Sequence, residues 1–110
     1  MSLDVSLKTM VKSNIFEAGI THNLTRMAAA AELYTPLWRP EELFQSTIIK
    51  AHQLVPFLEK GLITLKTEPE RFKLFNSSNG YGTYEDLVSF VEKYLDALYQ
   101  NPYAEVEVSR

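Results

Sequence analysis

Hydrophobic and polar residues alternate near both ends of the chain, with the period of two that a strand shows when one of its faces is buried. Near the N-terminus, this pattern places on one side Val5, Leu7, Thr9 and Val11. The turn-forming pair Ser13-Asn14 comes next, and a second alternating set follows it, Phe16, Ala18 and Ile20. The tail alternates in the same way, with one side formed by Ala104, Val106 and Val108. The pattern therefore predicts an N-terminal hairpin and a C-terminal strand.

The polar sides of the first and last predicted strands carry opposite charges. Lys8 and Lys12 lie on the first strand, whereas Glu105 and Glu107 lie on the last. Opposite charges on neighbouring strands stabilise a pair by roughly 0.2–1 kcal/mol. We therefore expect the two ends of the chain to pair, which gives a small antiparallel sheet from the hairpin and the C-terminal strand.

Between the strands, apolar residues recur at intervals of three and four, which is the spacing of an amphipathic helix. The clearest stripe follows Thr83 and consists of Leu87, Phe90, Val91, Tyr94, Leu95 and Leu98. Further helices are expected at residues 24–33 and 47–66, the second of them kinked or divided at Pro56. A short helical turn is expected after Pro69. Pro36 and Pro40 mark a connector, and Pro40 is suited to the first position of another helix.

These elements predict one α+β domain covering residues 1–110, in which the sheet packs against three to five helices.

Residues 76–86, NSSNGYGTYED, are the segment that most resembles a functional site. Asn79-Gly80 suits backbone with positive φ, and Thr83 with Asp86 fits the capping box that begins a helix. The segment lacks the lysine of a phosphate-binding loop, and Glu85 with Asp86 would repel an anion. We interpret it as a turn followed by a helix start.

Composition excludes several classes of function. The chain of 110 residues has a formal net charge of -3 and a pI of about 5.3, which argues against nucleic-acid binding. It has no cysteine, so disulfides and thiolate metal sites are excluded, and a reducing, cytoplasmic location is expected. No apolar run approaches the roughly 18 residues of a membrane span. No motif indicates a cofactor, and none is expected.

Aromatic residues in the predicted connectors suggest an interaction surface. Tyr81 and Tyr84 flank the last helix start, and Trp38 with Arg39 has the composition of a protein-binding hot spot. Trp38 has a second interpretation, because a lone tryptophan in a small domain is usually buried. Our leading hypothesis is a non-enzymatic module that binds a protein partner through Trp38, Arg39, Tyr81 and Tyr84.

The alternative hypothesis is a small enzyme or ligand-binding domain that uses His22 with Asn23 or Glu85. It requires these side chains to converge in one pocket. His22 and His52 are the only histidines, and they fall on different predicted helices, so a structural role is favoured for both.

Three stretches, ITHNLTRMA (20–28), LWRPEE (37–42) and NGYGTYEDLVSFVEKYLDA (79–97), together with the terminal EVEVSR, carry a resemblance. They resemble an uncharacterised family of small prokaryotic and phage-encoded proteins that has an N-G-aromatic-G-x-Y-E segment before its last helix. Tyr81 stands where that pattern has Trp. The resemblance implies a bacterial or phage setting and assigns no activity, cofactor or catalytic residue.

Overall fold

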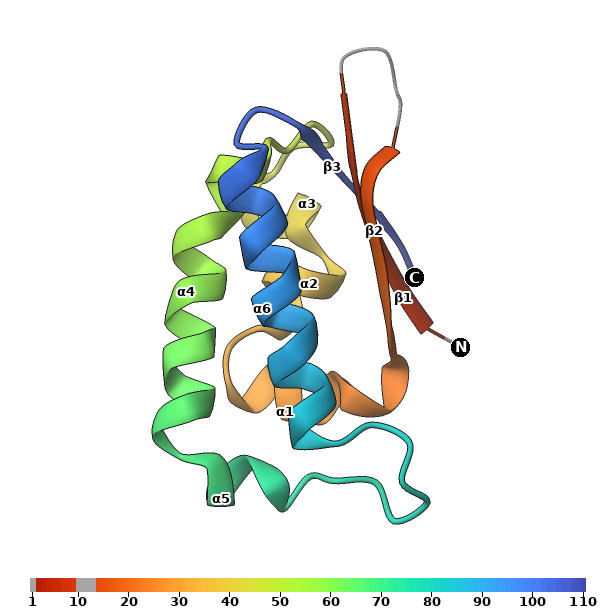
Figure 1. Cartoon of the computed structure of the whole chain (residues 1–110), viewed down its shortest axis with the longest axis vertical. Helices are drawn as coiled ribbons and strands as arrows, with labels where there is room; N and C mark the ends of the chain where they lie inside the picture. The colour runs from red at the N-terminus through yellow and green to blue at the C-terminus, as the bar shows by residue number, and fades with distance from the viewer. Residues whose placement is uncertain (1, 10–13) are drawn as a thin grey trace.

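The computed structural model describes residues 2–9 and 14–110 and has an α+β fold, in which the helices lie on one side of a small sheet (Figure 1). The strands are β1 (Ser2–Lys8), β2 (Asn14–Thr21) and β3 (Glu105–Ser109). The helical elements are η1 (His22–Leu24), α1 (Thr25–Ala30), α2 (Tyr34–Trp38), α3 (Pro40–Phe44), α4 (Ala51–Thr67), α5 (Pro69–Lys73) and α6 (Tyr84–Gln100). The predicted fold class is therefore confirmed, with more short helices than expected.

The sheet is antiparallel and has the order β2-β1-β3, so β1 is the central strand. Its inward-facing side chains Leu3, Val5 and Leu7 are fully buried. The predicted pairing of the two chain ends is confirmed, and Lys8 Nζ lies 2.9 Å from a carboxylate oxygen of Glu107. The expectations for Val11, Lys12 and Ser13 lie outside the described residues.

The segment predicted to be a connector is helical over α2, which contains Pro36 as its third residue. A proline in the first turn costs no backbone hydrogen bond, since the N–H groups there have no intrahelical acceptor. The preceding helix is shorter than predicted and ends at Ala30; two residues later Glu32 has a φ of 60°. Pro40 begins α3 as expected.

α4 begins at Ala51 rather than at Thr47, and it continues through Pro56 as one helix of 17 residues. Of the two expected alternatives, a kink or a division at Pro56, the division into two abutting helices is therefore wrong. One missing backbone bond is compensated by the buried face of α4, which includes Leu54, Leu58 and Leu65.

The core lies between the sheet, α6 and α4. The whole predicted stripe of α6 is buried, and the capping box is present, because Thr83 Oγ1 accepts from the Asp86 N–H while the Asp86 carboxylate accepts from the Thr83 N–H. Phe16 of β2 stacks on Tyr94 of α6 with ring centroids 6.1 Å apart. α6 is therefore attached directly to β2.

The contact between α4 and the turn before α2 depends on a glycine. A Cβ placed on Gly61 would lie 2.2 Å from Cδ2 of Leu33, a side chain that is fully buried. Contacts this short require the surroundings to move. We expect Gly61→Ala to lower the free energy of unfolding by about 1–3 kcal/mol, although alanine is the better helix former by about 1 kcal/mol. Urea denaturation measures the difference.

The double variant Leu33→Ala/Gly61→Ala provides the control. With the leucine branch removed, the added methyl group has room, so in this background Gly61→Ala should no longer cost stability and should raise it by up to about 1 kcal/mol. An equal cost in both backgrounds would show that steric contact with Leu33 is not the cause.

Candidate functional site

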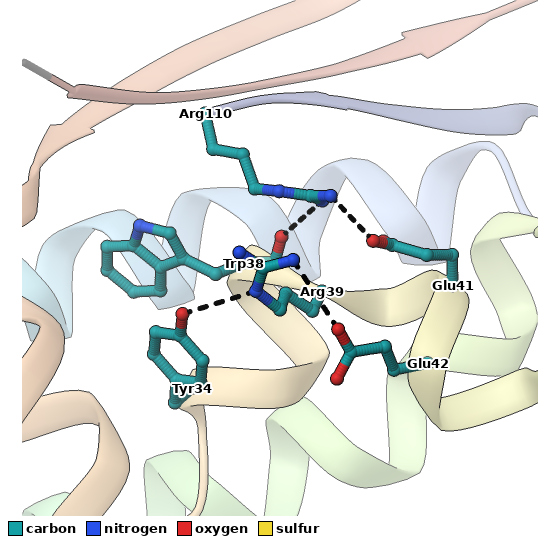
Figure 2. A network of polar contacts seen from close by, with 6 residues as sticks. All are labelled: Tyr34, Trp38, Arg39, Glu41, Glu42 and Arg110. Atoms are coloured by element: carbon teal, nitrogen blue, oxygen red, sulfur yellow. Dashed lines mark hydrogen bonds and ion pairs between the residues drawn. The ribbon is translucent and has the colours of Figure 1, made fainter.

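Trp38, one of the predicted surface residues, lies in the core. Its side chain is 2% exposed, and its ring stacks on Tyr34 at a centroid distance of 5.6 Å. Its carbonyl oxygen accepts a hydrogen bond of 2.9 Å from Arg110, which also forms an ion pair of 2.8 Å with Glu41 (Figure 2). Trp38 thus anchors the end of β3 to the α2–α3 segment, which confirms its alternative interpretation as a core residue.

Arg39 lies beside this network on the accessible side. Its Nε donates to the Tyr34 hydroxyl at 3.4 Å, and its Nη1 lies 3.4 Å from the Glu42 carboxylate. The side chain is 40% exposed. Arg39 is therefore available to a partner, although its guanidinium already has neighbours.

Tyr84 is also buried, with 9% of its surface exposed. Its hydroxyl donates to the carbonyl of Leu65 at 2.7 Å, and Lys73 Nζ lies 5.6 Å from its ring centre. Tyr81, by contrast, is 71% exposed. The expectation that Trp38 and Tyr84 supply exposed contact area is therefore wrong, because both side chains fill the core; Arg39 and Tyr81 remain accessible.

The exposed tyrosines lie at opposite ends of α6. Tyr81 precedes the helix, whereas Tyr99 and Tyr103 lie at and beyond its end. A helix of 17 residues is about 25 Å long at a rise of 1.5 Å per residue. These side chains therefore do not form one patch.

The polar loop before α6 is held by its own side chains. Asn76 accepts from the Tyr84 N–H at 2.8 Å, and Asn79 accepts from the Tyr81 N–H at 3.0 Å. Gly80 and Gly82 have φ values of 81° and 92°. Backbone donors that an anion would use are thus engaged within the loop, in agreement with the interpretation as a turn and helix cap.

The side chains of the alternative site, His22, Asn23 and Glu85, each contact other residues of the protein. The ring of His22 packs edge-on against Trp38 at 6.1 Å, and its Nε2 is buried without a hydrogen-bond partner among the described residues. Asn23 donates to the Tyr81 carbonyl at 3.2 Å, and Glu85 lies 3.9 Å from Lys73. No contact among the described residues joins His22 to Glu85.

A groove of about 520 Å³ runs between β2 and α6. The strand side consists of the consecutive residues 16–21, and the helix side consists of Asp86, Ser89, Phe90 and Lys93. These four residues share one helix face, since their spacings are three, four and seven. The sequence analysis did not predict this groove, because its two walls are far apart in the chain.

The two edges of the sheet differ in how they are covered. Outside β3, the Val106 N–H donates to the carbonyl of Ile49 at 2.8 Å, and Lys50 forms a bridge with Glu105. No described residue makes a backbone hydrogen bond to the outer edge of β2. Because alternate residues of an edge strand direct their N–H and C=O groups outward, β2 presents unpaired donors and acceptors beside the groove.

No protein-family model, curated protein or solved structure matches this chain. The resemblance to a family of small prokaryotic and phage-encoded proteins therefore stays a prediction. Among the described residues, no helix is long and apolar enough to cross a membrane, and no three His, Asp or Glu side chains gather as metal ligands would.

Two buried tyrosines permit a matched test of the polar contacts. Tyr84 has an acceptor for its hydroxyl, whereas the Tyr94 hydroxyl is buried without one among the described residues. We expect Tyr84→Phe to cost about 1 kcal/mol of unfolding free energy. Tyr94→Phe should leave stability unchanged or raise it, because it removes an unpaired buried group. Thermal and urea unfolding compare the two, and the reverse order of effects would contradict this assignment.

Glu41 gives a pH test of the link between β3 and α3. Partial burial acts to raise its pKa, but its backbone N–H and the Arg110 guanidinium outweigh that effect, so the pKa lies below the ordinary value. The stability from charged Glu41 is therefore present above its unfolded-state pKa and is lost as the pH falls through the lower folded-state pKa.

We expect Glu41→Gln to destabilise the protein at pH 7 by about 1 kcal/mol or less. The difference from wild type should shrink as the pH falls below the ordinary carboxyl range, because the folded-state pKa of Glu41 lies lower than that range. Urea unfolding across this range measures it. Glu42→Gln removes an equal charge outside the contact with Arg110 and serves as the control. A difference for Glu41→Gln that stays constant with pH would contradict the role of the ion pair.

Proposed function

We propose that this chain is a non-enzymatic protein-interaction module that binds an extended segment of a protein partner along the open edge of β2. The observation that carries the proposal is the uncovered edge of β2 beside the groove formed with α6. Extended peptides add to such edges as a further strand, with main-chain hydrogen bonds supplying affinity and side-chain contacts supplying specificity.

The composition of the strand supports this use. β2 has eight residues and contains no proline and one charged residue, Glu17. Edge strands that must avoid pairing usually carry proline, lysine or inward-pointing charges. On the groove side, Phe16 and Ala18 are only partly buried, so a partner would cover apolar surface as well as backbone groups.

The loop residue Tyr81 lies near one end of this groove. Its carbonyl is bonded to Asn23, two residues after β2 ends. An exposed tyrosine in this place extends the contact surface at low entropic cost. The cytoplasmic location and the bacterial or phage setting belong to the same proposal, supported by the absence of cysteine and by the resemblance.

Selection from a displayed library of random peptides tests the function directly. We expect selected peptides to bind with one peptide per chain and to shift the backbone amide resonances of residues 16–21 and of α6 in NMR titrations. Ala18→Lys should weaken this binding about tenfold or more, which corresponds to about 1.4 kcal/mol, since a long cationic side chain would enter the groove.

Ser109→Lys is the matched control, because it adds the same side chain at an exposed position on the other edge strand. It should leave peptide affinity unchanged. A library that yields no binder, or binders that are insensitive to Ala18→Lys, would contradict the proposed function.

A further inference from the structure

The groove has a defined direction, because α6 runs antiparallel to β2. At the end of β2, a Cβ on Gly82, just before α6, would lie 3.1 Å from Cγ2 of Thr21. Near its start, Phe16 stacks on Tyr94, in the middle of α6. Asp86 therefore lies towards the Thr21 end of the groove, and Lys93 lies towards the Phe16 end.

The helix wall of the groove carries opposite charges at its two ends. The strand wall adds Glu17 near the Phe16 end; its side chain alternates with those of Phe16 and Ala18 and accepts a hydrogen bond from Asn14. Asp86 and Lys93 are both exposed, and neither forms an ion pair with any described residue. Asp86 accepts from the Thr83 N–H through one carboxylate oxygen. An occupant of the groove thus meets, on the helix wall, a negative group at one end and a positive group at the other.

The middle of the groove is apolar. Phe90 lies on α6 between the two charged positions, and Ala18 and Gly19 are the two middle residues of the strand wall. A strand that adds to β2 presents alternate side chains to α6, about 6.7 Å apart. Asp86 and Lys93 are seven positions apart on α6, which is about 10 Å along its axis. Three alternate side chains of a ligand span about 13 Å, about 3 Å more than the two charges, and the flexible ends of a lysine and a glutamate side chain can cover this difference. The acid, the apolar centre and the base therefore each meet one of the three side chains in turn.

A second copy of the chain fits this groove less well than an isolated strand. Pairing β2 with its symmetry mate would place the two strands about 4.8 Å apart. Because α6 packs against β2, this pairing would also bring the two α6 helices together on one face of the joined sheet, and packed helices need 8–10 Å between their axes. A single extended segment brings no such helix.

We infer that the occupant of the groove is an extended segment with a basic, an apolar and an acidic residue at alternate positions, added antiparallel to β2. This inference rests on the proposed function. Antiparallel addition follows the pattern of the sheet and is the slightly more stable pairing. It places the basic residue first in the ligand sequence, beside Asp86, and the acidic residue last, beside Lys93.

Two labelled peptides of identical composition test the inference, one with the order Lys-Thr-Val-Thr-Glu and one with the order Glu-Thr-Val-Thr-Lys, both acetylated and amidated. We expect the wild-type chain to bind the first about three- to tenfold more tightly in fluorescence anisotropy at low salt, since two exposed charge pairs are exchanged for two repulsions. The preference should decrease as salt is added.

Lys93→Glu should remove the preference for the first peptide and favour a third peptide, Lys-Thr-Val-Thr-Lys. Lys60→Glu is the matched control, because it makes the same charge change at an exposed position of α4 outside the groove, and it should keep the wild-type preference. Asp86→Asn, which retains an oxygen for the Thr83 N–H, should weaken binding of the first peptide, whereas Glu85→Gln should not.

The outcomes separate this inference from the proposed function. Equal binding of the two peptide orders, with Ala18→Lys still blocking both, overturns the charge polarity and leaves strand addition in place. Tighter binding of the reversed order overturns the antiparallel direction. Failure of all three peptides, together with a library that yields no binder, overturns both. Sedimentation that shows a dimer, abolished by Ala18→Lys, overturns the choice of a peptide over a second copy.

Discussion

The antiparallel pairing of β1 with β3 determines most of the architecture. It makes β1 the central strand, fully buried on its helix-facing side, and it leaves β2 at an edge. It also brings Arg110 over the α2–α3 segment, where the guanidinium joins the Trp38 carbonyl to the Glu41 carboxylate (Figure 2). The same pairing places β3 beside residues 49–51, which cover its outer edge. The open edge and the covered edge are thus two results of one interaction.

The attachment of α6 to β2 converts the open edge into a groove. Phe16 and Tyr94 hold the strand under the helix, and the capping box at Thr83 fixes where the helix begins. A helix that began one residue later would rotate its faces by about 100° relative to the preceding loop. The polar loop therefore contributes to the site by setting the helix register, and its glycines serve the turn.

Much of the fold could be predicted from the sequence because its strongest signals are local. The alternation at both ends and the stripe from Leu87 to Leu98 each describe one face of one element, and the Lys8 and Glu107 charges indicated the pairing of the ends. The short helix α2 was missed because proline disfavours a helix interior but not its first turn, and a sequence does not reveal which of the two applies to Pro36.

The site was harder to predict, because exposure is a property of the packed molecule. Trp38 and Tyr84 have the residue types of a contact surface, but each fills a space that only the assembled helices define. The groove between β2 and α6 joins residues more than sixty positions apart. In the sequence, Asp86 and Lys93 resemble any solvent-exposed charged residues of a helix. Nothing in the local pattern shows that an unpaired strand lies beside them.

The position of β1 also has a consequence for the order of folding. Its two neighbours come from opposite ends of the sequence, so the hairpin can form early, whereas the contact with β3 closes a loop of roughly a hundred residues at an entropic cost of about 4 kcal/mol. During synthesis, the edge of β1 that pairs with β3 therefore stays unpaired in the nascent hairpin until residues 105–109 leave the ribosome. In that interval the hairpin exposes unpaired backbone N–H and C=O groups at the outer edges of both β1 and β2. The newly made polypeptide is therefore more prone to misassociation than the folded protein.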